Sequence, residues 1–81
     1  MGKYDPLSEY LRGQSQTEIT LSFRQIEKII GGSLPDSAMM AWWWGNDGGS
    51  QTAQVQRLAW TRARYHATLH AGRKVRFRKI P

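Results

Sequence analysis

The sequence contains no cysteine, which excludes disulfide bonds and zinc sites built on cysteine. It has no apolar run near the ~20 residues of a membrane-spanning helix, and residues 1–6 lack the apolar segment of a signal peptide. We therefore expect a cytoplasmic protein with no membrane partner. The 81 residues suffice for a single domain, 1–81, with a thin core that depends on side-chain packing.

Acidic residues are missing from the C-terminal part of the chain. Residues 48–81 contain eight basic residues and no acidic one, a net charge of +8, whereas residues 1–47 contain four basic and six acidic residues (4 − 6 = −2). A segment of one sign attracts phosphates and releases counterions when it binds them. The alternative is a solvated face that keeps the protein soluble, but such faces usually mix the two signs. The charge therefore favours a nucleic-acid partner.

The N-terminal half predicts two helices with a strand between them. Asp5 is expected to cap the first helix, with Pro6 at its first position, and Gly13 to end it. Residues 18–21 alternate polar and apolar side chains, as strands do. The Ser-x-x-Gln sequence that opens residues 22–30 has the spacing of a capping box and predicts the second helix.

The C-terminal half predicts a third helix and a hairpin. Residues 33–49 favour a turn or a short helix followed by a loop. The third helix starts at Ser50 and runs to Arg62 or Arg64, with an expected inner stripe of Val55, Leu58, Ala59 and Ala63.

The hairpin joins residues 65–70 to residues 74–80 through a turn at 71–73, because both runs alternate. Its expected covered face consists of Tyr65, Ala67, Leu69, Val75 and Phe77. The predicted fold is therefore α+β, with three or four short helices and a small antiparallel sheet made of one strand plus the C-terminal hairpin. This order is winged-helix-like, except that the connection between Gly31 and Ser50 is far longer than the turn of a helix-turn-helix.

Several motifs resemble those of a family of small, uncharacterised bacterial and phage domains. The matching segments are Lys3-Tyr4-Asp5-Pro6-Leu7, Leu34-Pro35 with Ser37-Ala38, Trp43-Trp44-Gly45-Asn46-Asp47, and Ala59-Trp60 with Ala63 and Tyr65. The resemblance covers nearly the whole chain. It implies a shared fold and brings no established activity.

The outer face of the third helix is the first candidate nucleic-acid site. Gln and Arg side chains can pair with adenine and guanine edges in the major groove. Spacings of 3, 3, 4 and 3 put five polar residues, four of them Gln or Arg, on one side of the predicted helix: Gln51, Gln54, Arg57, Thr61 and Arg64. An ordinary solvated helix face is the alternative.

The outer face of the hairpin is the second candidate. His66, Thr68 and His70 alternate on one strand, and basic residues occupy the turn and the other strand, namely Arg73, Lys74, Arg76 and Arg78. Like charges on one sheet face are unfavourable unless something negative covers them. A phosphate backbone would do so, whereas the alternative is a solvated edge that discourages aggregation.

The run Trp42-Trp43-Trp44 predicts at least one exposed tryptophan, because three neighbouring side chains cannot all face one thin core. Trp42 is the candidate, since only Trp43 and Trp44 match the family motif. An exposed Trp42 would bind a protein partner or stack on a base. The alternative is that all three tryptophans belong to the core.

No arrangement of residues predicts catalysis. No catalytic triad, carboxylate pair, phosphate-binding loop or metal site is visible, so we expect no enzyme activity, no metal and no cofactor. The sequence favours a non-catalytic nucleic-acid-binding domain, with DNA as the expected partner. Two alternatives stay open: a protein-binding module, such as a phage or mobile-element inhibitor of a host complex that uses the Trp cluster, or an accessory domain of a nuclease.

Overall fold

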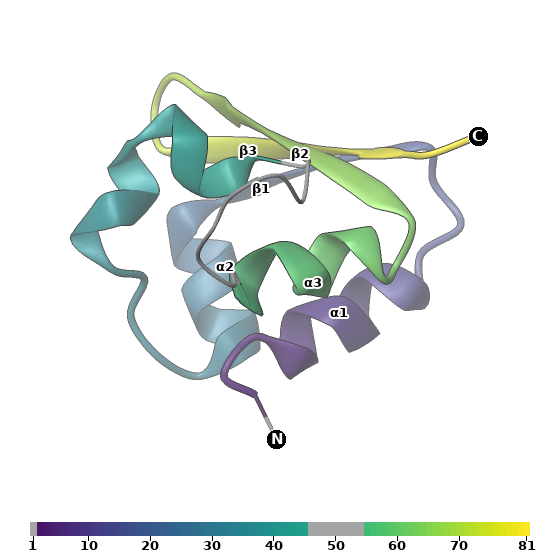
Figure 1. Ribbon diagram of the computed structural model, residues 1–81, viewed down its shortest axis with the longest axis horizontal. Helices are drawn as coiled ribbons and strands as arrows, with labels where there is room; N and C mark the ends of the chain where they lie inside the picture. Colours follow the sequence, from purple (N-terminus) through teal and green to yellow (C-terminus); the bar gives the residue numbers. More distant parts are fainter. Residues whose placement is uncertain (1, 46–54) are drawn as a thin grey trace.

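In the computed structural model, which describes residues 2–45 and 55–81, three helices cover one face of a three-stranded antiparallel sheet (Figure 1). No described element covers the opposite face, which we call the open face. The α+β class with a strand plus a C-terminal hairpin is confirmed. The elements are α1 Asp5–Arg12, β1 Glu18–Ser22, α2 Phe23–Ile30, the 3-10 helices η1 Asp36–Met39 and η2 Ala41–Trp44, α3 Val55–Thr61, β2 Tyr65–His70 and β3 Lys74–Lys79.

The sheet has the order β1-β3-β2, so the last strand lies in its middle. Phe77 of β3 pairs with Ile19 of β1 and with Ala67 of β2, and all three side chains are buried under the helices. Because successive strand residues point to opposite faces, their neighbours lie on the open face. The predicted covered face and the pairing of residues 65–69 with 75–78 are confirmed.

Helix α2 begins with the predicted capping box. The Ser22 hydroxyl accepts a hydrogen bond from the Gln25 amide at 3.1 Å, and the Gln25 side chain accepts one from the Ser22 amide at 2.8 Å. Two backbone donors that a helix start leaves without partners are thereby satisfied. The helix ends at Gly31, whose φ of 71° is the left-handed conformation that glycine adopts without strain.

The core is built around an aromatic cluster. Trp44 stacks on Trp60 with ring centroids 5.2 Å apart, and both rings contact Phe77 at 6.4 and 6.1 Å. Trp44 also donates a hydrogen bond from its ring nitrogen to the Ala38 carbonyl at 2.8 Å. The cluster therefore links η1, η2, α3 and β3, which are far apart in the sequence.

The predicted inner stripe of the third helix is confirmed at Ala59 and Ala63, which are buried, and wrong at Leu58. Leu58, expected inside, is 42% exposed, whereas Gln56 and Trp60 are buried together with Ala59. The stacking of Trp60 on Trp44 explains why the helix turns Trp60, and not Leu58, toward the core, because an indole ring buries more apolar area than a leucine side chain. The helix also ends at Thr61, earlier than expected, and its predicted start at Ser50 lies outside the described residues.

Candidate nucleic-acid interface

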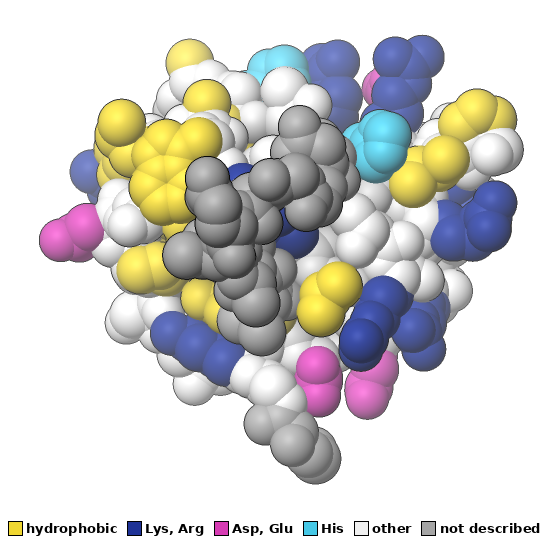
Figure 2. Space-filling model, viewed as in Figure 1, with side chains coloured by type: hydrophobic (Ala, Val, Ile, Leu, Met, Phe, Trp, Pro, Cys, Tyr) yellow, Lys and Arg dark blue, Asp and Glu magenta, His cyan; other side chains and the backbone are white. Residues whose placement is uncertain are grey.

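The open face of the sheet carries a row of basic side chains. Lys74, Arg76 and Arg78 alternate along β3 and are all exposed, because the residues between them turn inward to the core. β3 is the central strand, so the row runs along the middle of the face. In Figure 2, Lys and Arg side chains project from the top of the molecule, where Figure 1 places this face.

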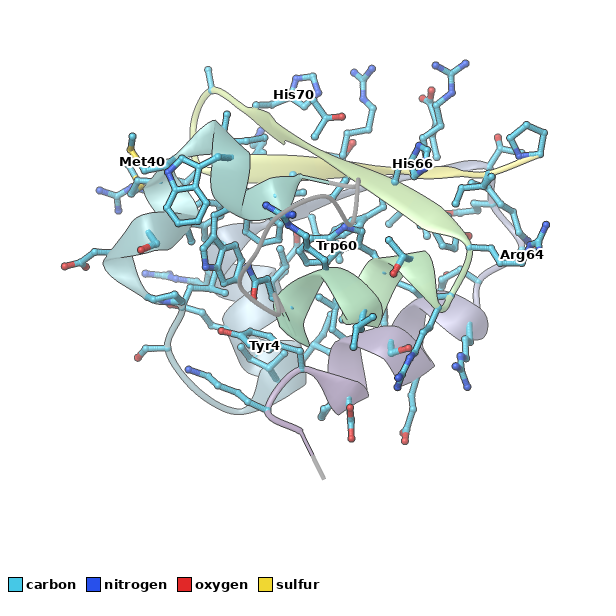
Figure 3. The ribbon with its side chains drawn as sticks, in the orientation of Figure 1. Tyr4, Met40, Trp60, Arg64, His66 and His70 are labelled. Atoms are coloured by element: carbon cyan, nitrogen blue, oxygen red, sulfur yellow. The ribbon has the colours of Figure 1, made fainter. Side chains whose placement is uncertain are left out.

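Polar side chains flank the basic row on both sides. The strand register puts Arg76 between Thr20 and Thr68, and Lys74 between Ser22 and His70. These hydroxyl and imidazole groups can share hydrogen bonds with phosphate oxygens. His66 and His70 extend from β2 on the side away from the helices (Figure 3).

One acidic residue interrupts the row. Glu18 pairs with Arg78 across the β1–β3 ladder, with 3.6 Å between Oε2 of Glu18 and Nε of Arg78. Both side chains are largely exposed, and pairs of this kind contribute little to stability. Arg78 can therefore exchange this partner for a phosphate at small cost, and the row remains net positive.

Arg73 extends the basic row at the hairpin turn. Its backbone has a φ of 56°, next to Gly72 with a φ of 79°, and its carbonyl accepts a hydrogen bond from the Phe23 amide at 2.9 Å. This bond fixes the turn against the start of α2. The predicted hairpin residues thus follow one another along the turn and the central strand, with Lys74, Arg76 and Arg78 on the open face and Arg73 in the turn.

The predicted row on the third helix is not assembled as expected. Arg57 points toward η2 and donates a hydrogen bond from Nη2 to the Trp42 carbonyl at 2.9 Å, and the Thr61 hydroxyl donates to the Arg57 carbonyl at 2.8 Å. Arg64 lies beyond the end of α3, at the end of the sheet (Figure 3). Gln51 and Gln54 lie outside the described residues. The periodicity of the helix did not predict the hydrogen bond from Arg57 to a backbone carbonyl of η2.

Arg64 has a strained backbone that gives a testable consequence. Its φ of 67° is in the left-handed region, which a side chain with a Cβ adopts at a cost of about 1–2 kcal/mol. We expect Arg64→Gly to raise the free energy of unfolding by up to about 1 kcal/mol, after the entropy that glycine adds to the unfolded chain. Urea denaturation checks this. Arg62→Gly, where φ is not positive, is the matched control and should destabilise; equal effects at both positions would contradict the strain.

The predicted exposure of Trp42 is confirmed. Its side chain is 53% exposed, whereas Trp43 and Trp44 are 5% and 1% exposed. Sequence analysis missed two further exposed apolar residues beside it, Met39 and Met40, which are also 53% exposed. The two short 3-10 helices present them, because Met40 adopts an extended conformation between η1 and η2. The consecutive methionines in the sequence were a signal of this apolar surface, but the direction of their side chains depends on the extended Met40 backbone between the two short helices.

A groove between α1 and α3 has a different character from the open face. Lys3, Arg12 and Arg62 line it together with Asp5 and Glu9, so its charges largely cancel. Tyr4 lies at its wall, and burial raises the pKa of the Tyr4 hydroxyl, which therefore stays neutral at physiological pH. This groove does not favour a polyanion.

Among the described residues, no group of three or more His, Asp or Glu side chains is placed to hold a metal ion, and no helix is long and apolar enough to span a membrane. A family model described as a domain of unknown function (DUF7662) matches residues 4–81. No curated protein and no solved structure matches the chain.

Proposed function

The chain belongs to the DUF7662 family, and we propose that it is a non-catalytic, cytoplasmic nucleic-acid-binding domain that holds the phosphate backbone on the open face of its sheet. DNA is the partner we expect. The observation that carries the proposal is the exposed row Lys74, Arg76 and Arg78 on the central strand, flanked by hydroxyl and imidazole groups.

The spacing of this row suits a phosphate backbone. Alternate residues of a strand are about 7 Å apart, twice the rise per residue. Consecutive phosphates of an extended nucleic-acid strand are separated by a similar distance, so one strand lying along β3 would meet one basic group per phosphate. Contacts of this kind position a protein on nucleic acid without reading bases. We therefore expect weak sequence preference.

The order of helices and strands is compatible with a winged-helix-like domain in which β2 and β3 form the wing. The proposed site relies less on the third helix, and more on the hairpin, than the sequence analysis predicted. Arg57 and Thr61 are engaged within the fold, so the described part of α3 adds little to a groove-reading surface. The hairpin supplies the main contacts in the proposal.

A salt titration tests the proposed function. Labelled duplex DNA, single-stranded DNA and RNA of equal length are titrated with the protein at several salt concentrations, and affinity is followed by fluorescence anisotropy. Three phosphate contacts predict a slope of log K against log salt of about −2.7 on duplex and about −2 on single strands. No binding at low salt, or binding that does not depend on salt, would contradict the proposal.

A further inference from the structure

A second surface, separate from the basic row, is apolar. It consists of Met39 on η1, Trp42 on η2 and Met40 between the two, each 53% exposed. In Figure 2 hydrophobic side chains gather at the upper left of the molecule, and Figure 3 labels Met40 there. Contiguous exposed apolar side chains on a small protein indicate an interaction site. We call these three residues the apolar surface.

The fold holds the apolar surface in a fixed geometry. Arg57 of α3 donates a hydrogen bond to the Trp42 carbonyl at 2.9 Å. Ala38 and Trp44 flank the three residues in the sequence. Ala38 is fully buried and its carbonyl accepts a hydrogen bond from the Trp44 ring nitrogen at 2.8 Å. The exposed side chains are thus presented by anchored backbone, which reduces the entropy that binding would cost.

A cleft adjoins this surface at the hairpin turn. Met39 lines it together with Phe23 and Leu69, which are only partly buried, and its volume is about 500 Å³. The hydrogen bond from the Phe23 amide to the Arg73 carbonyl joins α2 to the turn beside it. The cleft is therefore mainly apolar and can receive a large side chain of a partner.

No acidic residue is among the described residues that line the cleft. Its titratable lining residues are His70 and Arg73. Lys74 follows Arg73 on β3 and is exposed. A partner that places an apolar side chain in the cleft would thus meet basic groups at the rim, which favours carboxylates next to that side chain.

A protein segment fits this cleft better than a nucleobase does. Methionine side chains adapt to irregular apolar partners, and tryptophan is enriched at the centres of protein interfaces. A base would bring hydrogen-bonding edges against Met39, Phe23 and Leu69, where they would lack partners. We propose that the apolar surface and its cleft bind a protein partner through a short acidic segment that carries one large apolar side chain.

The proposal does not depend on nucleic-acid binding, since Met39, Met40, Trp42, Phe23 and Leu69 lie outside the basic row and only the rim residues Arg73 and Lys74 are shared with it. Its test is therefore separate. A displayed library of random short peptides is selected on the immobilised protein at moderate salt. We expect the selected peptides to share one large aliphatic or aromatic residue flanked by Asp or Glu. Met39→Ser and Trp42→Ser should each weaken their binding at least tenfold, and Arg73→Asn a few-fold.

Leu58→Ser is the matched control, because Leu58 is a 42% exposed apolar residue on α3, outside the cleft. It should bind the selected peptides as the parent protein does, and melting curves check that all variants fold. The proposal fails if no peptide is enriched, if the flanking residues are basic, or if the control loses binding equally. It also fails if Trp42→Ser abolishes self-association of the protein, which would make a second copy the occupant, or if it weakens single-stranded DNA binding instead of peptide binding.

Discussion

Replacing Trp44 by alanine is expected to cost more than about 3 kcal/mol of stability, as large-to-small changes in protein cores do. Its side chain is 1% exposed and stacks on Trp60 at 5.2 Å. The change would leave a cavity where η2, α3 and β3 meet, and would remove the donor that the Ala38 carbonyl now has. Domains of this size are stable by only about 5–15 kcal/mol, so much of the folding free energy would be lost.

Trp42→Ala provides the matched control within the same run of tryptophans. Trp42 is 53% exposed, so its removal should change the free energy of unfolding by less than about 1 kcal/mol. Urea denaturation followed by circular dichroism measures both variants. If Trp42→Ala unfolds as readily as Trp44→Ala, all three tryptophans belong to the core, and the description of Trp42 as an exposed residue of η2 is wrong.

Elements defined by local patterns could be predicted from the sequence. The capping box at Ser22 fixes the start of α2 within four residues, and the alternation along β3 separates Val75 and Phe77 from the basic row. Both signals act between near neighbours in the chain, so they survive without knowledge of the tertiary structure. The basic row of the candidate site was predictable for the same reason.

Elements whose orientation depends on distant contacts could not be predicted. The phase of α3 follows from Trp60 meeting Trp44 and Phe77, which lie 16 residues before and 17 residues after it in the sequence. The direction of Arg57 depends on the position of the Trp42 carbonyl. The periodicity of the helix alone includes neither the aromatic rings that Trp60 meets nor the carbonyl that Arg57 binds. It therefore placed Leu58 inside and Arg57 outside.

Reversing the charge of the basic row should have the largest effect on nucleic-acid binding. Arg76→Glu with Arg78→Glu removes two positive groups from the middle of the open face and adds two negative ones next to Glu18. Like charges facing each other across an interface cost several kcal/mol. We expect affinity to fall about 100-fold or more, where each factor of ten corresponds to about 1.4 kcal/mol.

A control with the same change in net charge is available elsewhere on the surface. Lys79 ends β3 and lies over the Tyr65 ring, with 5.9 Å from Nζ to the ring centroid, and Arg62 lines the groove beside α1. Lys79→Glu with Arg62→Glu therefore reverses two charges away from the basic row. The long-range field of the protein weakens equally in both double variants, so a difference between them reports on contact.

The most direct test compares the parent protein and these two double variants in anisotropy titrations of one labelled DNA at several salt concentrations. We predict that the Arg76/Arg78 variant loses about 100-fold in affinity and that the magnitude of its salt slope falls by about 1.8 on duplex, the equivalent of two phosphates. The Lys79/Arg62 variant should lose only a few-fold and keep its slope. Equal losses in the two variants would show that net charge alone drives binding, and would contradict a phosphate site on the open face.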